Sequence, residues 1–154
     1  MWNRIETKED IQQLLDKTWF FHDSCIKELH YVSGAYVTQD LGMYPVNNRR
    51  TVMLVLQRQF EDMPVLELEF SGLKYMRLCP ADAKHTCEIL GATMTQKDGF
   101  IYWCDWDGIP DAELDTYPGT IICAAECRWR YSKGPLGDQL IFRPLTQEAE
   151  CSTD

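Results

Sequence analysis

His22-Asp23-Ser24 brings together the three side-chain types of a nucleophilic catalytic triad. A triad needs an imidazole, a carboxylate and a hydroxyl group that converge in space, whereas three consecutive residues project in different directions. We therefore expect this segment to form the corner between a helix and a strand, with Asp23 or Ser24 bonding nearby backbone amides. No catalytic residue is predicted from it.

The cysteines and histidines do not have the spacing of a metal site. The seven cysteines form no pair of CxxC motifs, no HExxH segment occurs, and His22, His30 and His85 fall in separate predicted elements. Asp105-Trp106-Asp107-Gly108 lacks the later oxygen ligands of a calcium loop. A glycine-rich phosphate loop is absent as well, so we expect neither a metal ion nor a cofactor.

Carboxylates are concentrated in one late segment. Asp105, Asp107, Asp111, Glu113 and Asp115 lie within eleven residues that contain no lysine or arginine. Two interpretations stay open at this point. The segment is either a solvated loop or a face that binds a basic protein partner through complementary charge.

The net charge limits the classes of partner. The chain holds 24 acidic and 15 basic residues, which gives a formal net charge of −9. Nucleic acids and anionic membranes are bound by basic surfaces that release counterions, so we expect neither as a partner. A basic protein matches this charge better.

Cysteine usage and the amino-terminal segment predict the compartment. An odd number of cysteines without a secretory segment favours reduced thiols and a cytoplasmic protein. No stretch of the sequence approaches the ~18 consecutive apolar residues of a membrane-spanning helix. We therefore expect no contact with a membrane.

A cleft with aromatic walls is the alternative site. Its members would be an imidazole, several carboxylates and two indoles: His22, Asp23, Asp105, Asp107, Trp103 and Trp106. Proton exchange between imidazole and carboxylate, with pKa values tuned by burial, would make this a small-ligand-binding protein or an enzyme. If no such cleft exists, the tryptophans are explained as side chains that fill the hydrophobic core.

One helix is predicted near the amino terminus. Thr7 followed by Asp10 has the spacing of a capping box, and Ile11, Leu14 and Leu15 follow on one helical face. These positions predict a helix over residues 8–18 whose apolar stripe packs on a sheet.

The rest of the chain has the alternation and turn residues of β-structure. We expect strands at 25–37 (with a bulge between Ile26 and Leu29), 51–60, 65–73, 86–95, 100–106, 120–131 and 140–142. Asp98-Gly99 predicts a tight hairpin, and the residues of segment 39–50 are typical of turns.

The prediction is a single mainly β (α+β) domain over residues 1–154. It has an antiparallel sheet or sandwich of about six to seven strands, one amino-terminal helix, a β-rich part at 25–142 and a polar tail at 146–154.

The segment Trp19-Phe20-Phe21-His22-Asp23-Ser24-Cys25-Ile26 resembles the start of small bacterial proteins, some of which are immunity proteins of polymorphic toxin systems. Glu67-Leu68-Glu69-Phe70 and Arg128-Trp129-Arg130 resemble later strands of that group. The resemblance spans roughly residues 19–131 and brings no catalytic residues. It implies a non-enzymatic binding protein, an inhibitor of a basic toxin, that is a monomer or, through an exposed edge strand, a homodimer.

Overall fold

A computed structural model describes residues 1–132 and 136–139. The expected strand at 140–142 and the expected tail at 146–154 lie outside these residues. The elements, in chain order, are β1 (Asn3–Ile5), α1 (Lys8–Thr18), β2 (Ser24–Val32), β3 (Tyr36–Val37), β4 (Met43–Tyr44), β5 (Thr51–Arg58), β6 (Val65–Arg77), β7 (Thr93–Lys97), β8 (Phe100–Cys104), a short 3-10 helix (Leu114–Thr116) and β9 (Ile121–Ser132).

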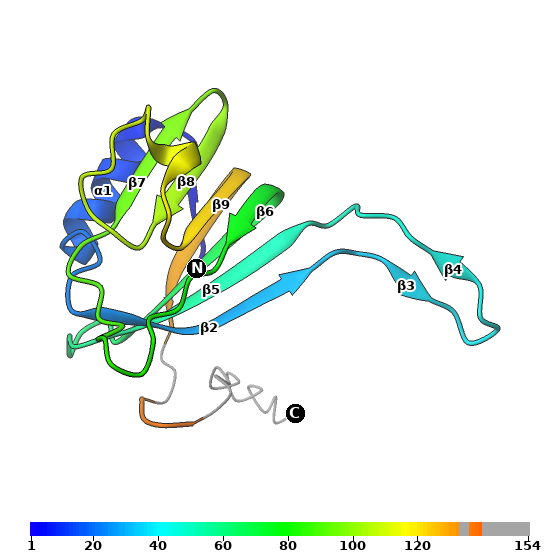
Figure 1. The fold of residues 1–154 in the computed structure, drawn as a ribbon, viewed down its shortest axis with the longest axis horizontal. Coiled ribbons are helices and arrows are strands. Elements are labelled where there is room, and N and C mark those ends of the chain that lie inside the picture. The colour runs from blue at the N-terminus through cyan, green and yellow to red at the C-terminus, as the bar shows by residue number, and fades with distance from the viewer. Residues whose placement is uncertain (133–135, 140–154) are drawn as a thin grey trace, which may run out of the picture.

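The strands form one large antiparallel sheet with α1 beside it (Figure 1). The strand order is β2-β5-β6-β9-β8-β7, and β1 pairs with the same edge of β9 that β8 uses. β3 and β4 form a separate two-stranded sheet. The prediction of a mainly β protein with an antiparallel sheet and one amino-terminal helix is therefore confirmed. No helix in the described part of the chain is long and apolar enough to cross a membrane.

Both faces of the sheet are covered, because alternate residues of a strand point to opposite sides. On one face, α1 contributes Ile11, Leu14 and Leu15 to a large apolar core that includes Trp103. On the other face, Leu114 completes a smaller cluster made by alternate residues of β8 and β9: Tyr102, Cys104, Ile121 and Cys123. The loop between β8 and β9 is thus the lid of this second cluster.

The helix begins and ends where the sequence predicts. The Thr7 hydroxyl accepts a hydrogen bond from the amide of Asp10 at 3.2 Å, and the Asp10 carboxylate accepts one from the amide of Thr7 at 2.8 Å. Trp19 then adopts a left-handed φ of 50° and stops the helix. Phe20, Phe21 and Asp23 also have positive φ, a conformation that L-residues seldom adopt.

Tertiary contacts hold this unusual corner in place. Phe21 is fully buried and packs edge-on against Trp103, with ring centroids 6.0 Å apart. The hydroxyl of Ser24 donates to the carbonyl of Phe21, and the amide of Ala92 donates to the carbonyl of Phe20. The expectation of side chains bonding backbone amides here was wrong in detail, since Ser24 bonds a carbonyl and Asp23 pairs with His22 instead.

Other boundaries differ from the prediction. The expected strand at 86–95 begins only at Thr93, because Ile89 bridges to Ser24 and ties the preceding segment to the corner. The expected strand at 25–37 is divided into β2 and β3 around Gly34, whose φ is 96°. The bulge near Ile26 and the hairpin at Asp98 and Gly99 are confirmed.

The segment between β2 and β5 leaves the body of the protein as an arm (Figure 1). We use "the arm" for residues 31–50, which run out from the end of β2, through β3 and β4, and back to the start of β5. The turn-rich segment predicted at 39–50 therefore also contains a strand, β4. In this view the two-stranded sheet lies at the far end, well away from α1.

A glycine in β6 is required by the packing of β6 on β9. Gly72 has φ 65°, and a Cβ at this position would lie 3.0 Å from the Cβ of Ala125. Gly99, in the β7–β8 turn, has φ 78° but open space around it. We expect Gly72→Ala to lower the free energy of unfolding by about 1–2 kcal/mol for the left-handed backbone, and further for the contact.

Urea unfolding of Gly72→Ala and Gly99→Ala separates the cost of the left-handed backbone from the cost of the contact with Ala125. Both variants share the backbone cost, and only Gly72→Ala adds the contact. Gly72→Ala should lose more stability than Gly99→Ala. An equal or smaller loss for Gly72→Ala would show that the approach of β6 to β9 does not depend on this glycine.

Candidate functional site

The two ends of the acidic segment are fastened to the sheet. We call residues 105–115 "the acidic loop". Asp105 accepts a hydrogen bond from the hydroxyl of Tyr117 at 2.7 Å and another from the amide of Thr120 at 3.1 Å. At the other end, Asp115 accepts from the hydroxyl of Tyr75 at 2.8 Å. These carboxylates therefore fasten both ends of the loop to the sheet.

Asp115 has two further partners from the sheet. The ammonium of Lys97 lies 3.2 Å from its second oxygen, and the hydroxyl of Tyr102 lies 3.4 Å from the first. The hydrogen bond from Tyr75 lowers the pKa of Asp115 most, followed by the hydrogen bond from Lys97. Burial raises the pKa of Tyr75 and of Tyr102, so both stay protonated donors.

Three carboxylates of the acidic loop are left facing solvent. Asp107, Asp111 and Glu113 are exposed. Within the described residues, the side chains of Asp107 and Glu113 have no hydrogen bond or ion pair, and Asp111 has one long contact of 3.4 Å with the Thr95 hydroxyl. Trp106, 62% exposed, stands beside Asp107. The loop thus presents carboxylates and one indole from a fixed backbone.

Lys97 is the residue that sequence reasoning missed. The acidic segment contains no basic residue, but the β7–β8 hairpin brings Lys97 against it, where its ammonium also donates to the backbone carbonyl of Asp111 at 3.0 Å. Only the register of the hairpin could have indicated this contact, because Lys97 and Asp115 are eighteen residues apart.

The predicted aromatic cleft is not assembled. Trp103 is fully buried in the core. His22 pairs with Asp23 at 2.8 Å, and both side chains are well exposed. Asp23 lines one cavity of about 540 Å³, whereas Asp105 and Trp106 line a different cavity of about 520 Å³. The alternative interpretation placed the indole of Trp103 at a cleft, but both faces of β8 are covered and leave no room for one.

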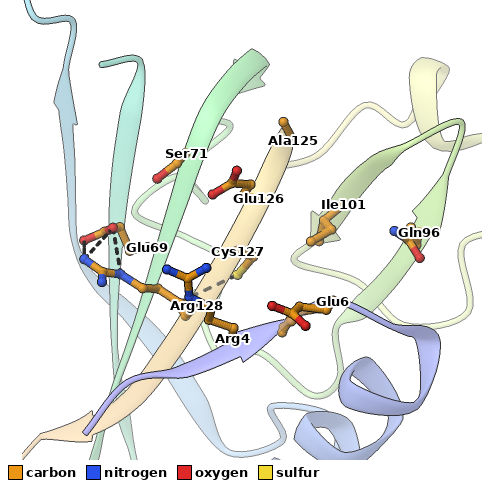
Figure 2. Close-up of a pocket in the computed structure, with 11 residues that line it drawn as sticks. Arg4, Glu6, Glu69, Ser71, Gln96, Ile101, Ala125, Glu126, Cys127 and Arg128 are labelled. Carbon is orange, nitrogen blue, oxygen red and sulfur yellow. Dashed lines mark hydrogen bonds and ion pairs between the residues drawn. The ribbon is translucent and has the colours of Figure 1, made fainter. Parts of the chain in front are cut away.

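A third cavity, of about 460 Å³, lies where β1 and β8 share the edge of β9 (Figure 2). β8 pairs with residues 121–124 of β9 and β1 with residues 127–129, so Ala125 and Glu126 lie in the gap between them. Alternate residues of a strand direct their backbone groups to opposite edges, and one residue of this pair therefore points its amide and carbonyl into the gap.

Charged side chains of both signs surround this gap. Arg128 bonds Glu69 through two nitrogens at 2.8 and 2.9 Å, which raises the pKa of Arg128. Arg4 lies opposite Arg128 in the β1–β9 pairing. Among the described residues, the side chains of Arg4, Glu6 and Glu126 have no hydrogen bond or ion pair. They are free to bind a ligand.

Thiol chemistry is disfavoured at this cavity, and metal ligands are not grouped. Cys127 lines the cavity, but burial raises the pKa of its thiol far above neutrality. In residues 1–132 and 136–139, no three histidine, cysteine or acidic side chains are grouped so that they could hold a metal ion.

Comparison with known proteins adds no relative. Neither a protein-family model, nor a curated protein, nor a solved structure matches this chain. The function must therefore be inferred from the geometry and charge of the surfaces described above.

The lowered pKa of Asp115 predicts an acid-sensitive anchor. A carboxyl group whose pKa is lowered by folding stabilises the protein above its unfolded pKa of 3.8, and this contribution is lost as the pH falls through the lower, folded value. Asp115→Asn should therefore be less stable than the wild type at pH 7, and the difference should shrink as the pH falls below about 4.

Urea midpoints at pH 7 and pH 3 measure this difference. Glu113→Gln is the matched control, because Glu113 is an exposed carboxylate of the same loop without a partner in the described structure. It should leave both midpoints unchanged. Equal effects of the two substitutions at pH 7 would contradict the anchoring role of Asp115.

Proposed function

We propose that this protein is a non-enzymatic binding protein that holds a basic protein partner on its acidic loop. The observation that carries this proposal is that the five carboxylates of the acidic loop fall into two groups, two that anchor the loop and three that face solvent. Asp105 and Asp115 fasten the loop, and Asp107, Asp111 and Glu113 face outward. The anchors also place Leu114 over the smaller apolar cluster, so the three outward carboxylates stand on a packed segment.

A loop that is already ordered binds with a smaller loss of conformational entropy. Ordering a flexible loop at an interface costs free energy, and a loop fixed in advance avoids much of that cost. The exposed carboxylates, on a chain of net charge −9, would speed the approach of a basic partner. Trp106 supplies the kind of aromatic side chain that often anchors an interface.

The partner class that we propose first is a basic bacterial toxin met in the cytoplasm. This choice is supported by the resemblance of residues 19–26 to immunity proteins. Those residues form the corner after α1, where Phe21 packs against Trp103. In such a complex the acidic loop would cover a basic active site of the toxin.

Neutralising the exposed carboxylates should abolish capture of the partner. In the loop variant, Asp107→Asn, Asp111→Asn and Glu113→Gln are combined, which changes no anchoring contact of Asp105 or Asp115. Used as bait in an extract of the source cells, the wild type should retain a basic protein that the loop variant does not. The association rate of the purified pair should fall as salt is added.

A control variant with the same net charge separates a local effect from a general one. Glu9, Glu61 and Asp62 are exposed carboxylates elsewhere on the chain, and their neutralisation should leave capture intact. Retention of the same basic protein by the loop variant, or its loss from both variants, would exclude the acidic loop as the binding face.

The cavity between β1 and β8 favours a second candidate function, the binding of a small zwitterion such as a free amino acid. Arg4 could bind a carboxylate, and Glu6 and Glu126 could bind an ammonium group, since these side chains have no partner in the described structure. Cavities that bind small molecules typically combine such a concave shape with a few polar groups.

A thermal-shift screen with a panel of free amino acids tests this second candidate. A ligand should raise the melting temperature of the wild type, because it binds only the folded state. The shift should be lost in Arg4→Gln and kept in Arg49→Gln, which removes an exposed arginine of the arm instead. No shift with any amino acid, or an equal shift in Arg4→Gln, would rule out this site.

A further inference from the structure

The arm exposes an unusual number of large apolar side chains. Leu41 is 83% exposed and Met43 is 71% exposed. The other large exposed apolar residues of the arm are Tyr31, Val32, Tyr36, Val37, Tyr44 and Val46. Such a concentration of exposed apolar side chains on one segment is typical of an interaction site, because a monomer gains nothing by leaving them in water.

Both faces of the arm are apolar near its tip. Tyr36 and Tyr44 pair across the two strands with their rings stacked at 4.9 Å, and the next pair is Val37 and Met43. Neighbouring pairs point to opposite faces, so neither face is polar. A two-stranded ribbon is marginally stable by itself in water, and among residues 1–132 and 136–139 no other strand lies beside this one.

The charge of the arm is opposite to that of the remaining chain. Residues 31–50 contain two arginines, Arg49 and Arg50, and one acidic residue, Asp40. All other residues together contain 13 basic and 23 acidic side chains. The body of a second copy is therefore an electrostatically suitable surface for the arm.

That body also carries an apolar groove. The cavity of about 520 Å³ is lined by Ile26 and Leu29 of β2 and by Leu78, Pro80 and Ile89. Leu78 is half exposed. The charged side chains in its wall are one lysine and three acidic residues: Lys27, Glu28, Glu88 and Asp105. The interior of the groove is thus apolar, which matches the exposed apolar side chains of the arm.

We propose that the arm of one copy lies in the groove of a second copy, and that a two-fold axis places the second arm in the first groove. Such an interface uses the same pair of surfaces twice. The eight large apolar side chains on each arm, which are 41–83% exposed, offer an area comparable to the roughly 800 Å² per partner of a standard stable interface. The groove does not include Asp107, Asp111 or Glu113, but Trp106 lines it, so the docked arm would contact this indole of the acidic loop.

Sedimentation velocity of the full chain over a range of micromolar concentrations tests the proposal. The wild type should sediment as a dimer. An arm variant, Leu41→Asn with Met43→Thr, and a groove variant, Leu78→Asn, should each raise the dissociation constant at least about tenfold. A wild type that stays monomeric throughout, or an arm variant that dimerises as well as the wild type, would overturn the proposal.

The control removes an exposed apolar side chain elsewhere. Leu41 and Trp19 both have left-handed φ, of 67° and 50°, which asparagine tolerates, so Trp19→Asn matches Leu41→Asn in chemistry and backbone. Trp19→Asn should dimerise normally. Circular dichroism checks that the variants remain folded, as substitutions of exposed side chains should allow.

Mixing the two defective variants distinguishes this dimer from one in which two arms pair with each other. The groove variant has an intact arm and the arm variant an intact groove, so a mixture can form one complete contact. The mixture should dimerise more tightly than either variant alone. Absence of rescue would overturn the docking of arm in groove. The loop variant should still dimerise, so this result is independent of partner capture by the acidic loop.

Discussion

The hydrogen bonds that Asp115 accepts determine how the second face of the sheet is covered. Two tyrosine hydroxyls and the ammonium of Lys97 reach this carboxylate from β6, β7 and β8. With Asp105 fixed at the other end by Tyr117 and Thr120, the acidic loop places Leu114 over the smaller apolar cluster. The loop is therefore part of the packed structure, and its remaining carboxylates face solvent on a defined backbone.

The main sheet also explains where the other two surfaces arise. β9 is paired along one edge with β6 and along the other with both β1 and β8, which leaves the gap of the mixed-charge cavity. β2 and β5 extend into an arm that leaves the body (Figure 1). Three separate surfaces with different chemistry therefore follow from one sheet. The acidic loop suits a basic protein, the cavity suits a small zwitterion, and the arm suits an apolar groove.

Local features of the sequence predicted the helix from Thr7 and Asp10, the Asp98-Gly99 hairpin and the mainly antiparallel fold, because each depends on neighbours in the chain. Contacts between distant segments were missed. Lys97 reaches Asp115 only through the hairpin register, and Ile89 is drawn to Ser24 instead of extending β7. The sequence could not decide whether Trp103 lies in the core or at a cleft, because this depends on both faces of β8 being covered. The carboxylates were identified from composition, but which of them are anchors required the structure.

The central claim is that the acidic loop is a fixed binding face in the free protein. Backbone ¹⁵N relaxation of residues 105–115, without any partner, tests it most directly. Our account predicts order parameters of about 0.85 across the loop, equal to those of the neighbouring strands. Order parameters below about 0.6 for the loop, beside rigid strands, would contradict the account and leave a solvated, flexible segment in its place.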